Sequence, residues 1–360
     1  MQGVLTDKHS KFLKRHLGVL PSRYQEHDAN KLSIVGYSLL GLSCLSDEAT
    51  DPFKGSRSWL RRHYRTGLFN GKKIGGFCPS QLLDVENATS ISLPNTLFAL
   101  WSFICLKDTT VLTEIDRVDI CRFVSMCQSP NDGSFVGSLD VLKESTTSPT
   151  ESNDSRMSYI AVVILYLLGL KTPEEMSEFI DIRGLVEYLK TKCCINGGFG
   201  EYGEAHAGYT SCALSVFAIL KTEWHGLSET FLEETLAWLK MRQVSSQGCH
   251  CFQNENEYFD AQDNGGFQGR ENKFADSCYV FWCLNSIRII EETHTNETER
   301  GAMRFLLERT QNSLIGGFSK NDEEEPDLYH TCMSLAAIGL MTGKFNGPLF
   351  LPTHLVVAAL

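Results

Sequence analysis

Three residues of the types that bind catalytic zinc gather late in the chain. Asp276 and Cys278 stand two positions apart, and His330 lies near the start of the next apolar segment. One oxygen, one sulfur and one nitrogen ligand leave a coordination position open, which is typical of catalytic rather than structural zinc. The same residues also fit a helix cap, a core thiol and a buried histidine. The spacing alone leaves both interpretations open.

Basic and hydrogen-bonding side chains occupy the same stretches of sequence: His206, Arg270, Lys273, Tyr279 and Lys320. The chain as a whole has 33 basic and 44 acidic residues and a net charge of −11. Local basicity in an acidic chain indicates a bound phosphate group, because Arg and Lys stabilise the negative charge that develops on a leaving group. The alternative is a set of solvated side chains that pair with Glu271 and with the acidic run at 322–325.

A repeated turn must position these residues. An aromatic residue follows a glycine turn five times, at Gly75-Gly76-Phe77, Asp132-Gly133-Ser134-Phe135, Gly197-Gly198-Phe199, Gly265-Gly266-Phe267 and Gly316-Gly317-Phe318. The copies are 51 to 68 residues apart, enough for two helices and their connections. Residues that follow each turn should therefore meet on one side of a repeat protein.

The pattern around the turns predicts helical hairpins. Amphipathic helices are expected before the turns, at Ile115–Cys127, Ile182–Cys194, Phe231–Gln243 and Ala302–Gln311. Nearly apolar helices are expected after them, at Pro94–Leu106, Met157–Leu170, Tyr209–Leu220, Ser277–Ile287 and Leu328–Met341, with an early one at Leu32–Leu45. No run with strand periodicity is evident. We expect an all-α fold, a six-fold α/α toroid with the apolar helices inside, forming one domain over residues 1–360.

Composition excludes several classes of function. A net charge of −11 argues against nucleic-acid binding by phosphate neutralisation. The longest apolar run, Tyr159–Leu170, is shorter than the roughly 18 to 20 residues that span a bilayer, so no transmembrane helix is expected. Met1–Arg15 is charged throughout and does not resemble a secretory signal. The 13 cysteines are therefore interpreted as reduced thiols of a cytoplasmic protein.

Two sequence elements resemble a known family. Gly266-Phe267-Gln268-Gly269-Arg270, followed by Lys273, Asp276, Cys278, Tyr279 and Trp282 and then by Asp327-Leu328-Tyr329-His330, is similar to the β subunits of protein prenyltransferases. Glu204-Ala205-His206 with Gly208-Tyr209-Thr210 resembles a second motif of that family. The likeness covers nearly the whole chain and implies an α/α toroid with one Zn²⁺ per β subunit.

The resemblance implies a role for each matching residue. Asp276, Cys278 and His330 match the family's zinc ligands, and His206, Arg270, Lys273 and Tyr279 match its diphosphate site. Positions that line the family's isoprenoid and peptide cavity are matched by Arg156, Tyr159, Tyr209, Cys212 and Trp282. Aromatic side chains suit such a cavity, because a polyene needs an apolar wall and a carbocation-like centre is favoured by π density.

Two positions, Ser33 and Lys320, favour geranylgeranyltransferase type I within the family. Ser33 replaces the bulky tryptophan of farnesyltransferases, which leaves room for one more isoprene unit, and Tyr37 keeps an aromatic residue one turn later. Lys320 stands where farnesyltransferases place an aspartate associated with magnesium, so Mg²⁺ should not be required. The stretch Lys8–Leu32 also resembles fungal type I β subunits.

The resemblance further implies substrates and partners. These are geranylgeranyl diphosphate, small GTPases of the Rho, Rac and Rap type that end in a CaaX (CaaL) sequence, and an obligate α subunit shared with farnesyltransferase. Three alternatives remain. One is a farnesyltransferase β subunit, and another is an α/α-toroid glycoside hydrolase that uses Asp276 with Asp154 or Asp327. The last is a non-catalytic peptide-binding repeat.

Overall fold

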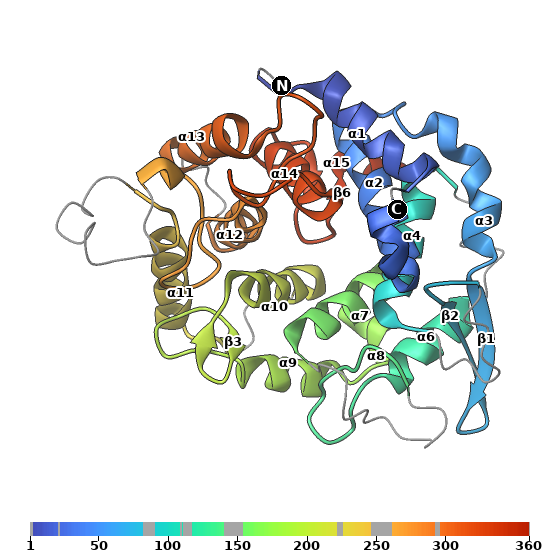
Figure 1. Cartoon of the computed structure of the whole chain (residues 1–360). Helices are drawn as coiled ribbons and strands as arrows, with labels where there is room; N and C mark the ends of the chain where they lie inside the picture. Colours follow the sequence, from blue (N-terminus) through green and yellow to red (C-terminus); the bar gives the residue numbers. More distant parts are fainter. Residues whose placement is uncertain are drawn as a thin grey trace.

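A closed ring of helices makes up this computed structural model, which describes residues 3–20, 22–81, 91–108, 110, 117–139, 154–221, 226–245, 261–291 and 296–359. Within these residues, six inner helices pack each against the next in chain order, and the last packs against the first. They are α2 (Lys31–Leu45), α4 (Leu93–Cys105), α7 (Ser155–Leu167), α10 (Ala207–Leu220), α12 (Ser277–Ile290) and α14 (Leu328–Met341). Figure 1 shows them around the centre of the ring. The predicted six-fold α/α toroid is confirmed.

The outer layer consists of amphipathic helices. They are α1 (Thr6–Gly18), α3 (Arg57–Arg61), α6 (Arg117–Met126), α9 (Ile182–Lys190), α11 (Glu229–Met241) and α13 (Asn296–Phe305). In α11, Thr235, Trp238 and Leu239 are buried, whereas Glu233 and Lys240 are exposed. This spacing of three and four residues turns one face toward the inner helix and leaves the other in water. Shorter helices are η1 (Ser22–Asn30), η2 (Asp51–Ser56), α8 (Pro173–Ser177), η3 (Ala261–Asp263), the π-helical turn η4 (Leu306–Thr310) and α15 (Thr353–Ala359).

The glycine–aromatic turns attach the two layers to each other. All five phenylalanines of these turns are fully buried, at 0% exposure. The backbone N–H of Phe199 donates to the Thr210 hydroxyl of the following inner helix at 2.9 Å, and the same bond joins Phe318 to Thr331. Each buried phenylalanine contributes about 1.5–3 kcal/mol relative to an exposed one. The turns are therefore a repeated element of stability.

The N-terminal helix closes the ring against the last turn. The His9 ring accepts the Gly317 N–H at Nδ1, at 2.9 Å, and contacts the Gln311 side chain at Nε2, at 2.8 Å. It also stacks on Phe318 with 4.6 Å between ring centroids. Gly316 has φ +79°, and a Cβ there would lie 2.3 Å from the Lys8 carbonyl oxygen. The close approach of α1 therefore requires glycine at position 316.

The inner helices begin on one rim of the ring. The first N–H of α10, at Ala207, donates to Gly269 in the segment that leads into α12. The first N–H of α12, at Ser277, likewise donates to Lys320 in the segment that leads into α14. Capping side chains start five of these helices: Ser92, Asp154, His206, Asp276 and Asp327. The segments that carry the predicted site residues are thus brought side by side.

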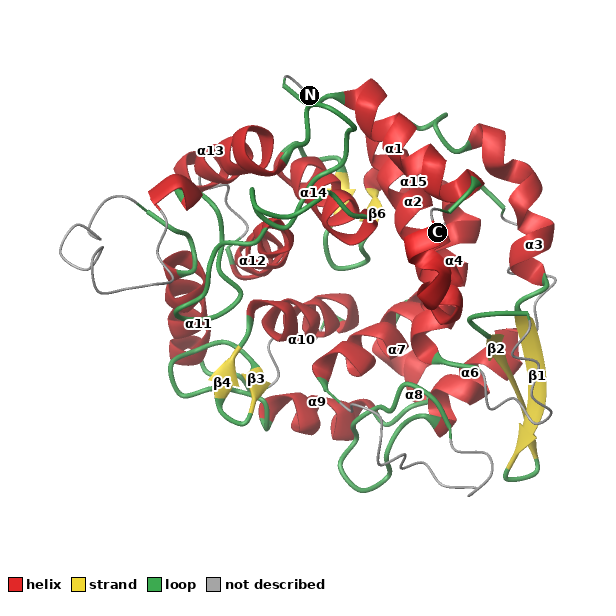
Figure 2. Cartoon of the chain, in the orientation of Figure 1, coloured by secondary structure: helices red, strands yellow, loops and turns green. Residues whose placement is uncertain are grey.

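The expectation that the chain has no strands was wrong. Strands β1 (Tyr64–Phe69) and β2 (Lys72–Phe77) form an antiparallel hairpin of six residue pairs. Asn70 and Gly71 connect them with φ values of 47° and 72°, the geometry of a two-residue turn that Asn-Gly favours. Two pairings of two residues each complete the strands: β3 (Gly200–Glu201) with β4 (Glu204–Ala205), and β5 (Phe345–Asn346) with β6 (Leu351–Pro352), in addition to isolated bridges. Figure 2 shows how few they are beside the helices.

The C-terminal segment packs across the ends of inner helices. Strands β5 and β6 contact α14, and α15 contacts α4. The Trp101 indole donates to the Leu349 carbonyl at 3.2 Å. Phe350, only 3% exposed, packs its ring against Trp101 and Trp282 from opposite sides of the ring of helices, with centroids 5.4 and 6.4 Å away. Its φ of 52° is unusual for a residue other than glycine.

Helix boundaries differ from the expected ones in places. The outer helix α9 ends at Lys190 rather than Cys194, and α13 begins at Asn296 rather than Ala302 before it continues into the π turn η4. The first two residues of the expected helix 115–127 lie outside the described residues. In the described part of the chain, none of the helices has both the length and the apolarity needed to cross a membrane.

Candidate metal centre and anion site

Asp276 has two structural roles at the start of α12. It is the N-cap residue, and its Oδ1 accepts the backbone N–H of Cys278 at 2.9 Å. Its own N–H donates to the carbonyl of Phe267, which follows the glycine turn. The extended backbone at the cap directs both Asp276 and Cys278 toward the beginning of the neighbouring helix α14. Asp276 can therefore cap the helix and still act as a metal ligand, because the cap brings its carboxylate beside the Cys278 thiol.

Asp276, Cys278 and His330 form a cluster of donor atoms. One ligand atom of each lies within 4.8 Å of the others, and Asp276 Oδ1 is 3.3 Å from His330 Nε2. Two ligands about 2.0 Å from a tetrahedral zinc ion lie about 3.3 Å apart. The side chains are at most 14% exposed. Donor set, spacing and burial fit a zinc ion with one coordination position open.

Asp327 holds the histidine of this cluster in place. Its Oδ2 lies 2.5 Å from His330 Nδ1, and its Oδ1 accepts the His330 backbone N–H at 2.9 Å. A carboxylate on one ring nitrogen fixes the other as the ligand atom, as second-shell carboxylates do in zinc proteins. This role of Asp327 was not predicted from the sequence. The spacing of three residues between a helix cap and a histidine is the signal that could have indicated it.

The protonation of the cluster follows from burial and from these hydrogen bonds. Burial raises the pKa of the Cys278 thiol well above its usual range, and Asp276 raises it further. Burial lowers the pKa of His330, but the hydrogen bonds that its ring donates to Asp276 and Asp327 outweigh burial and raise the pKa to about 9. The pKa of Asp276 is lowered, because its hydrogen bonds to His330 and Cys278 outweigh desolvation. A metal ion that binds at neutral pH must therefore displace protons from the thiol and the imidazole.

Aromatic side chains surround the sulfur of Cys278. Tyr329, next to the histidine, hydrogen-bonds with Cys278, and its hydroxyl accepts the Trp282 indole N–H at 3.3 Å. The Tyr37 ring packs edge-on against Tyr329 with 5.6 Å between centroids. Trp282 and Tyr37 were predicted as site residues, whereas Tyr329 was not. This group gives the candidate metal centre an apolar wall.

His206 and Tyr279 meet at the start of α10 and α12. His206 Nδ1 accepts the Gly208 backbone N–H at 3.1 Å, which leaves Nε2 as the protonated nitrogen, 3.1 Å from the Tyr279 hydroxyl. Burial lowers the pKa of His206, and Arg270 lowers it further, so the ring is a neutral donor. A Cβ at Gly269 would lie 2.2 Å from the Tyr279 ring. Glycine at 269 therefore creates the space that the tyrosine occupies.

Of the predicted basic side chains, Arg270 lies close enough to affect the pKa values of both His206 and Tyr279. Arg270 forms an ion pair with Glu204 at 2.5 Å, and both are partly exposed. Lys273 and Lys320 are exposed, and the Lys320 main chain bonds to the first residue of α12. Glu271, named above as an alternative partner for these cations, instead accepts the Trp238 indole N–H at 2.6 Å and lies 3.4 Å from Arg242. Asp322 pairs with Arg309.

The remaining predicted residues continue along α7, α10 and α2. Asp154 caps α7 and holds Arg156 with two bonds of 2.9 and 2.6 Å, and the guanidinium lies 5.5 Å from the centre of the Tyr209 ring. Tyr209 in turn contacts His206, with 4.9 Å between centroids. The neighbouring helices α7 and α10 also carry the buried side chains Tyr159 and Cys212. Ser33 lies in the first turn of α2 and donates to the Asn30 carbonyl at 2.7 Å.

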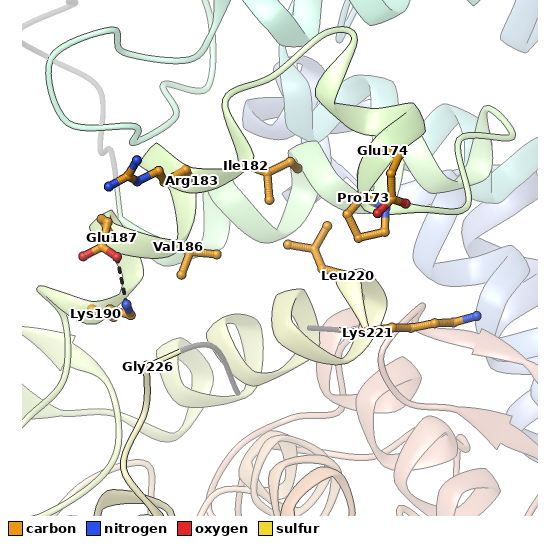
Figure 3. A pocket seen from close by; sticks show the side chains of 10 residues that line it. All are labelled: Pro173, Glu174, Ile182, Arg183, Val186, Glu187, Lys190, Leu220, Lys221 and Gly226. Atoms are coloured by element: carbon orange, nitrogen blue, oxygen red, sulfur yellow. Dashed lines mark hydrogen bonds and ion pairs between the residues drawn. The ribbon is translucent and has the colours of Figure 1, made fainter. Parts of the chain in front are cut away.

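A separate pocket lies on the outer layer, between α8, α9 and the end of α10 (Figure 3). Its walls include Ile182, Val186 and Leu220, with the Glu187–Lys190 ion pair of 2.8 Å at one side. Leu220 ends α10, whereas His206 caps its start, and a helix of 14 residues is about 20 Å long. This pocket therefore belongs to the opposite end of the helix and contains none of the predicted site residues.

The sequence matches the model of a known protein family over nearly its whole length. The model of the prenyltransferase alpha-alpha toroid domain matches residues 4–357. The chain belongs to the prenyltransferase family. Within it, the chain is similar to the β subunits of protein prenyltransferases.

Individual relatives of this prenyltransferase chain include two kinds of enzyme subunit. The protein farnesyltransferase subunit beta of Schizosaccharomyces pombe is 26% identical over 344 residues, which cover 92% of this chain and 76% of that protein. The geranylgeranyl transferase type-1 subunit beta of Dictyostelium discoideum is 25% identical over 363 residues, which cover 94% and 90%. The solved Candida albicans protein geranylgeranyltransferase-I complexed with GGPP is 29% identical, with a TM-score of 0.83, and the match covers 99% of this chain and 98% of that one.

Proposed function

We propose that this chain is the catalytic β subunit of a protein geranylgeranyltransferase type I. It would transfer the geranylgeranyl group of geranylgeranyl diphosphate to the cysteine thiol of a C-terminal CaaX sequence. The observation that carries the proposal is the Asp276–Cys278–His330 cluster on the same rim as His206, Tyr279 and Arg270. The likeness over almost the full chain to the Candida geranylgeranyltransferase-I supports it.

Asp276, Cys278 and His330 would hold one Zn²⁺ per β subunit. When bound, zinc would keep the acceptor cysteine as a thiolate near neutral pH, so that no general base from the chain is needed. Asp327 keeps the imidazole of His330 oriented. Tyr329 and Trp282 would keep water away from the position at which the acceptor sulfur binds. The chain thus provides the metal ligands, holds them in orientation and lines the site with an apolar surface that excludes water.

The basic side chains of the rim would receive the charge of the leaving group. As the bond between the acceptor sulfur and C1 of the lipid forms, the bond between C1 and oxygen breaks and its electron pair leaves with diphosphate. Arg270, Lys273 and Lys320 stabilise that charge as cations, and His206 and Tyr279 donate neutral hydrogen bonds. We assign Lys320 the role that a magnesium ion would otherwise have, so Mg²⁺ is not required.

Ser33 is the residue that we propose selects the longer lipid. Its small side chain at the start of α2, one turn before Tyr37, would leave room for the last isoprene unit. Arg156, Tyr159, Tyr209, Cys212 and Trp282 would provide the rest of the lipid and peptide contacts. The alternative within the family is a farnesyltransferase β subunit, which the Schizosaccharomyces relative represents.

The hydrolase alternative fits the geometry less well. It needs two carboxylates free to act as acid and base. Asp154 caps α7 and is bound by both Arg156 and the helix backbone, whereas Asp327 is bound to His330. Asp276 caps α12 beside a thiol. We therefore prefer the transferase, acting with an α subunit on CaaX-ending small GTPases.

A competition between two lipids tests the proposal. The chain would be co-expressed with a prenyltransferase α subunit, and the complex given labelled geranylgeranyl and farnesyl diphosphate with a CaaL peptide in the absence of Mg²⁺. Geranylgeranyl transfer supports the proposal, and Ser33→Trp should then shift the preference toward farnesyl. Farnesyl preference by the unmodified complex would refute the role of Ser33, and absence of transfer of either lipid would refute the proposed function.

A further inference from the structure

One segment of this acidic chain is strongly basic. Between Asp51 and Asp84 the sequence contains no acidic residue and seven lysines and arginines, whereas the whole chain has a net charge of −11. The seven are Lys54, Arg57, Arg61, Arg62, Arg65, Lys72 and Lys73. The proposed transferase site uses none of them. Such a concentration of one sign of charge indicates an anionic partner.

The segment forms η2, α3 and the hairpin β1–β2, which lies at the outer edge of the ring (Figure 1). Lys72 and Lys73 follow the turn and are exposed, as is Arg62 before β1. Leu68, two residues before the turn, is 65% exposed. Leu68 lies directly opposite Lys73 in the hairpin. Helices that bind at a lipid–water interface likewise combine exposed apolar side chains with Lys and Arg.

A groove next to the hairpin carries the same charge. Lys72, Lys73 and Arg122 line it together with Met126 and Phe179, and Glu178 is the one carboxylate in its lining. The buried Asp119 is shared by two of these cations, Lys73 and Arg122. Asp108 is similarly shared by Arg57 and Arg61, at 3.8 and 3.2 Å. One carboxylate for two cations leaves each cluster with net positive charge.

We propose that the β1–β2 hairpin and this groove dock the enzyme on an anionic lipid bilayer. Lipid phosphates would lie among Lys72, Lys73 and Arg122, while Leu68 reaches toward the acyl chains. At physiological salt, charges separated by more than about 8 Å are screened, so the acidic remainder of the chain does not cancel this local attraction. The inference goes beyond the proposed reaction and does not depend on it, although a lipid donor and a lipidated product both belong at such a surface.

Vesicle binding by the complex with the α subunit tests this proposal. Vesicles of phosphatidylcholine with phosphatidylserine would be sedimented with the complex and compared with vesicles of phosphatidylcholine alone. Each basic residue at the surface contributes about fivefold to partitioning, so Lys72→Glu, a change of two charge units, should weaken binding about 25-fold. Leu68→Ser should weaken binding to the same vesicles without altering its salt dependence.

Arg183→Glu is the matched control, because it makes the same charge change at an exposed position of the outer helix α9. We expect it to bind vesicles as the unmodified complex does, and all three variants to keep transfer to a soluble peptide. Equal binding to both kinds of vesicle, or an equal loss in Arg183→Glu and Lys72→Glu, would overturn the proposal. Either result would leave the transferase assay unaffected.

Discussion

Replacing Asp327 by asparagine should weaken metal binding without unfolding the helix that carries the histidine. Asp327 contacts His330 twice, through Oδ2 at the ring nitrogen and through Oδ1 at the backbone N–H. Asparagine retains an oxygen that can cap α14, but it removes the charge that orients the ring and raises its basicity. Loss of such a second-shell carboxylate lowers metal affinity about 10- to 100-fold. This corresponds to about 1.4–2.7 kcal/mol.

Two measurements distinguish the contact of Asp327 with the His330 ring, which orients the ligand, from its contact with the His330 backbone N–H, which caps the helix. Competition with a chelator gives the zinc affinity of the complex, and denaturant unfolding of the metal-free complex gives the stability. Asp327→Asn should change mainly the affinity, whereas Asp327→Ala should in addition lose about 0.5–2 kcal/mol of stability with the cap. Asp181→Asn is a matched control, because Asp181 caps the outer helix α9 away from the cluster. If Asp327→Asn bound zinc as tightly as the unmodified complex, the orienting role of Asp327 would be wrong.

Three further predictions concern protons, magnesium and the C-terminal segment. Zinc affinity should rise steeply between about pH 6 and about pH 8, by up to 100-fold per pH unit, because two ligands must each lose a proton before zinc binds. The pKa of His330 is raised to about 9, and burial raises the pKa of Cys278. Chelator competition across this pH range measures the slope. Lys320→Asp should make transfer respond to added Mg²⁺, which a rate measured against Mg²⁺ concentration checks. Phe350→Ala should lower the free energy of unfolding by about 3–5 kcal/mol, measured by denaturant titration, because its buried ring packs against two tryptophans.

For each of these three predictions, one experimental outcome would refute the physical reason given. A pH-independent zinc affinity would mean that neither group is protonated in the metal-free protein. Unchanged metal dependence in Lys320→Asp would remove the role assigned to that lysine. A loss of stability below about 1 kcal/mol in Phe350→Ala would show that the segment collapses around the missing ring, and the conservative Phe350→Leu should recover most of the stability if packing is the cause.

The repeat architecture was predictable because its signal is local. Four of the five glycine–aromatic turns lie between an amphipathic and an apolar helix, and both periodicities can be read from about a dozen residues. The hairpin β1–β2 was missed although Asn70-Gly71 is a recognisable turn signal, because its strands do not alternate strictly between buried and exposed residues. Helix ends such as that of α9 depend on tertiary contacts, which a sequence pattern does not contain.

The site was predictable in its residue types but not in its contacts. Residue type and spacing made Asp276, Cys278 and His330 candidates, the family resemblance selected them as metal ligands, and the structure brings their ligand atoms together. The bond between His206 and Tyr279 joins residues 73 positions apart, so it depends on how α10 and α12 pack. Tyr329 was missed because an aromatic residue in a helix is most simply interpreted as core. Its contacts with Cys278 appear only when α14 is placed beside α12.

A comparison of two cysteines of one helix tests the proposed zinc site most directly. Cys278 and Cys283 are both buried thiols of α12, but only Cys278 belongs to the cluster. In complexes with the α subunit, bound zinc and geranylgeranyl transfer to a CaaL peptide would be measured for Cys278→Ala and Cys283→Ala. We expect Cys278→Ala to lose both zinc and transfer, whereas Cys283→Ala keeps about one zinc per complex and its activity. Retention of zinc and transfer by Cys278→Ala would contradict the role of Cys278 as a zinc ligand.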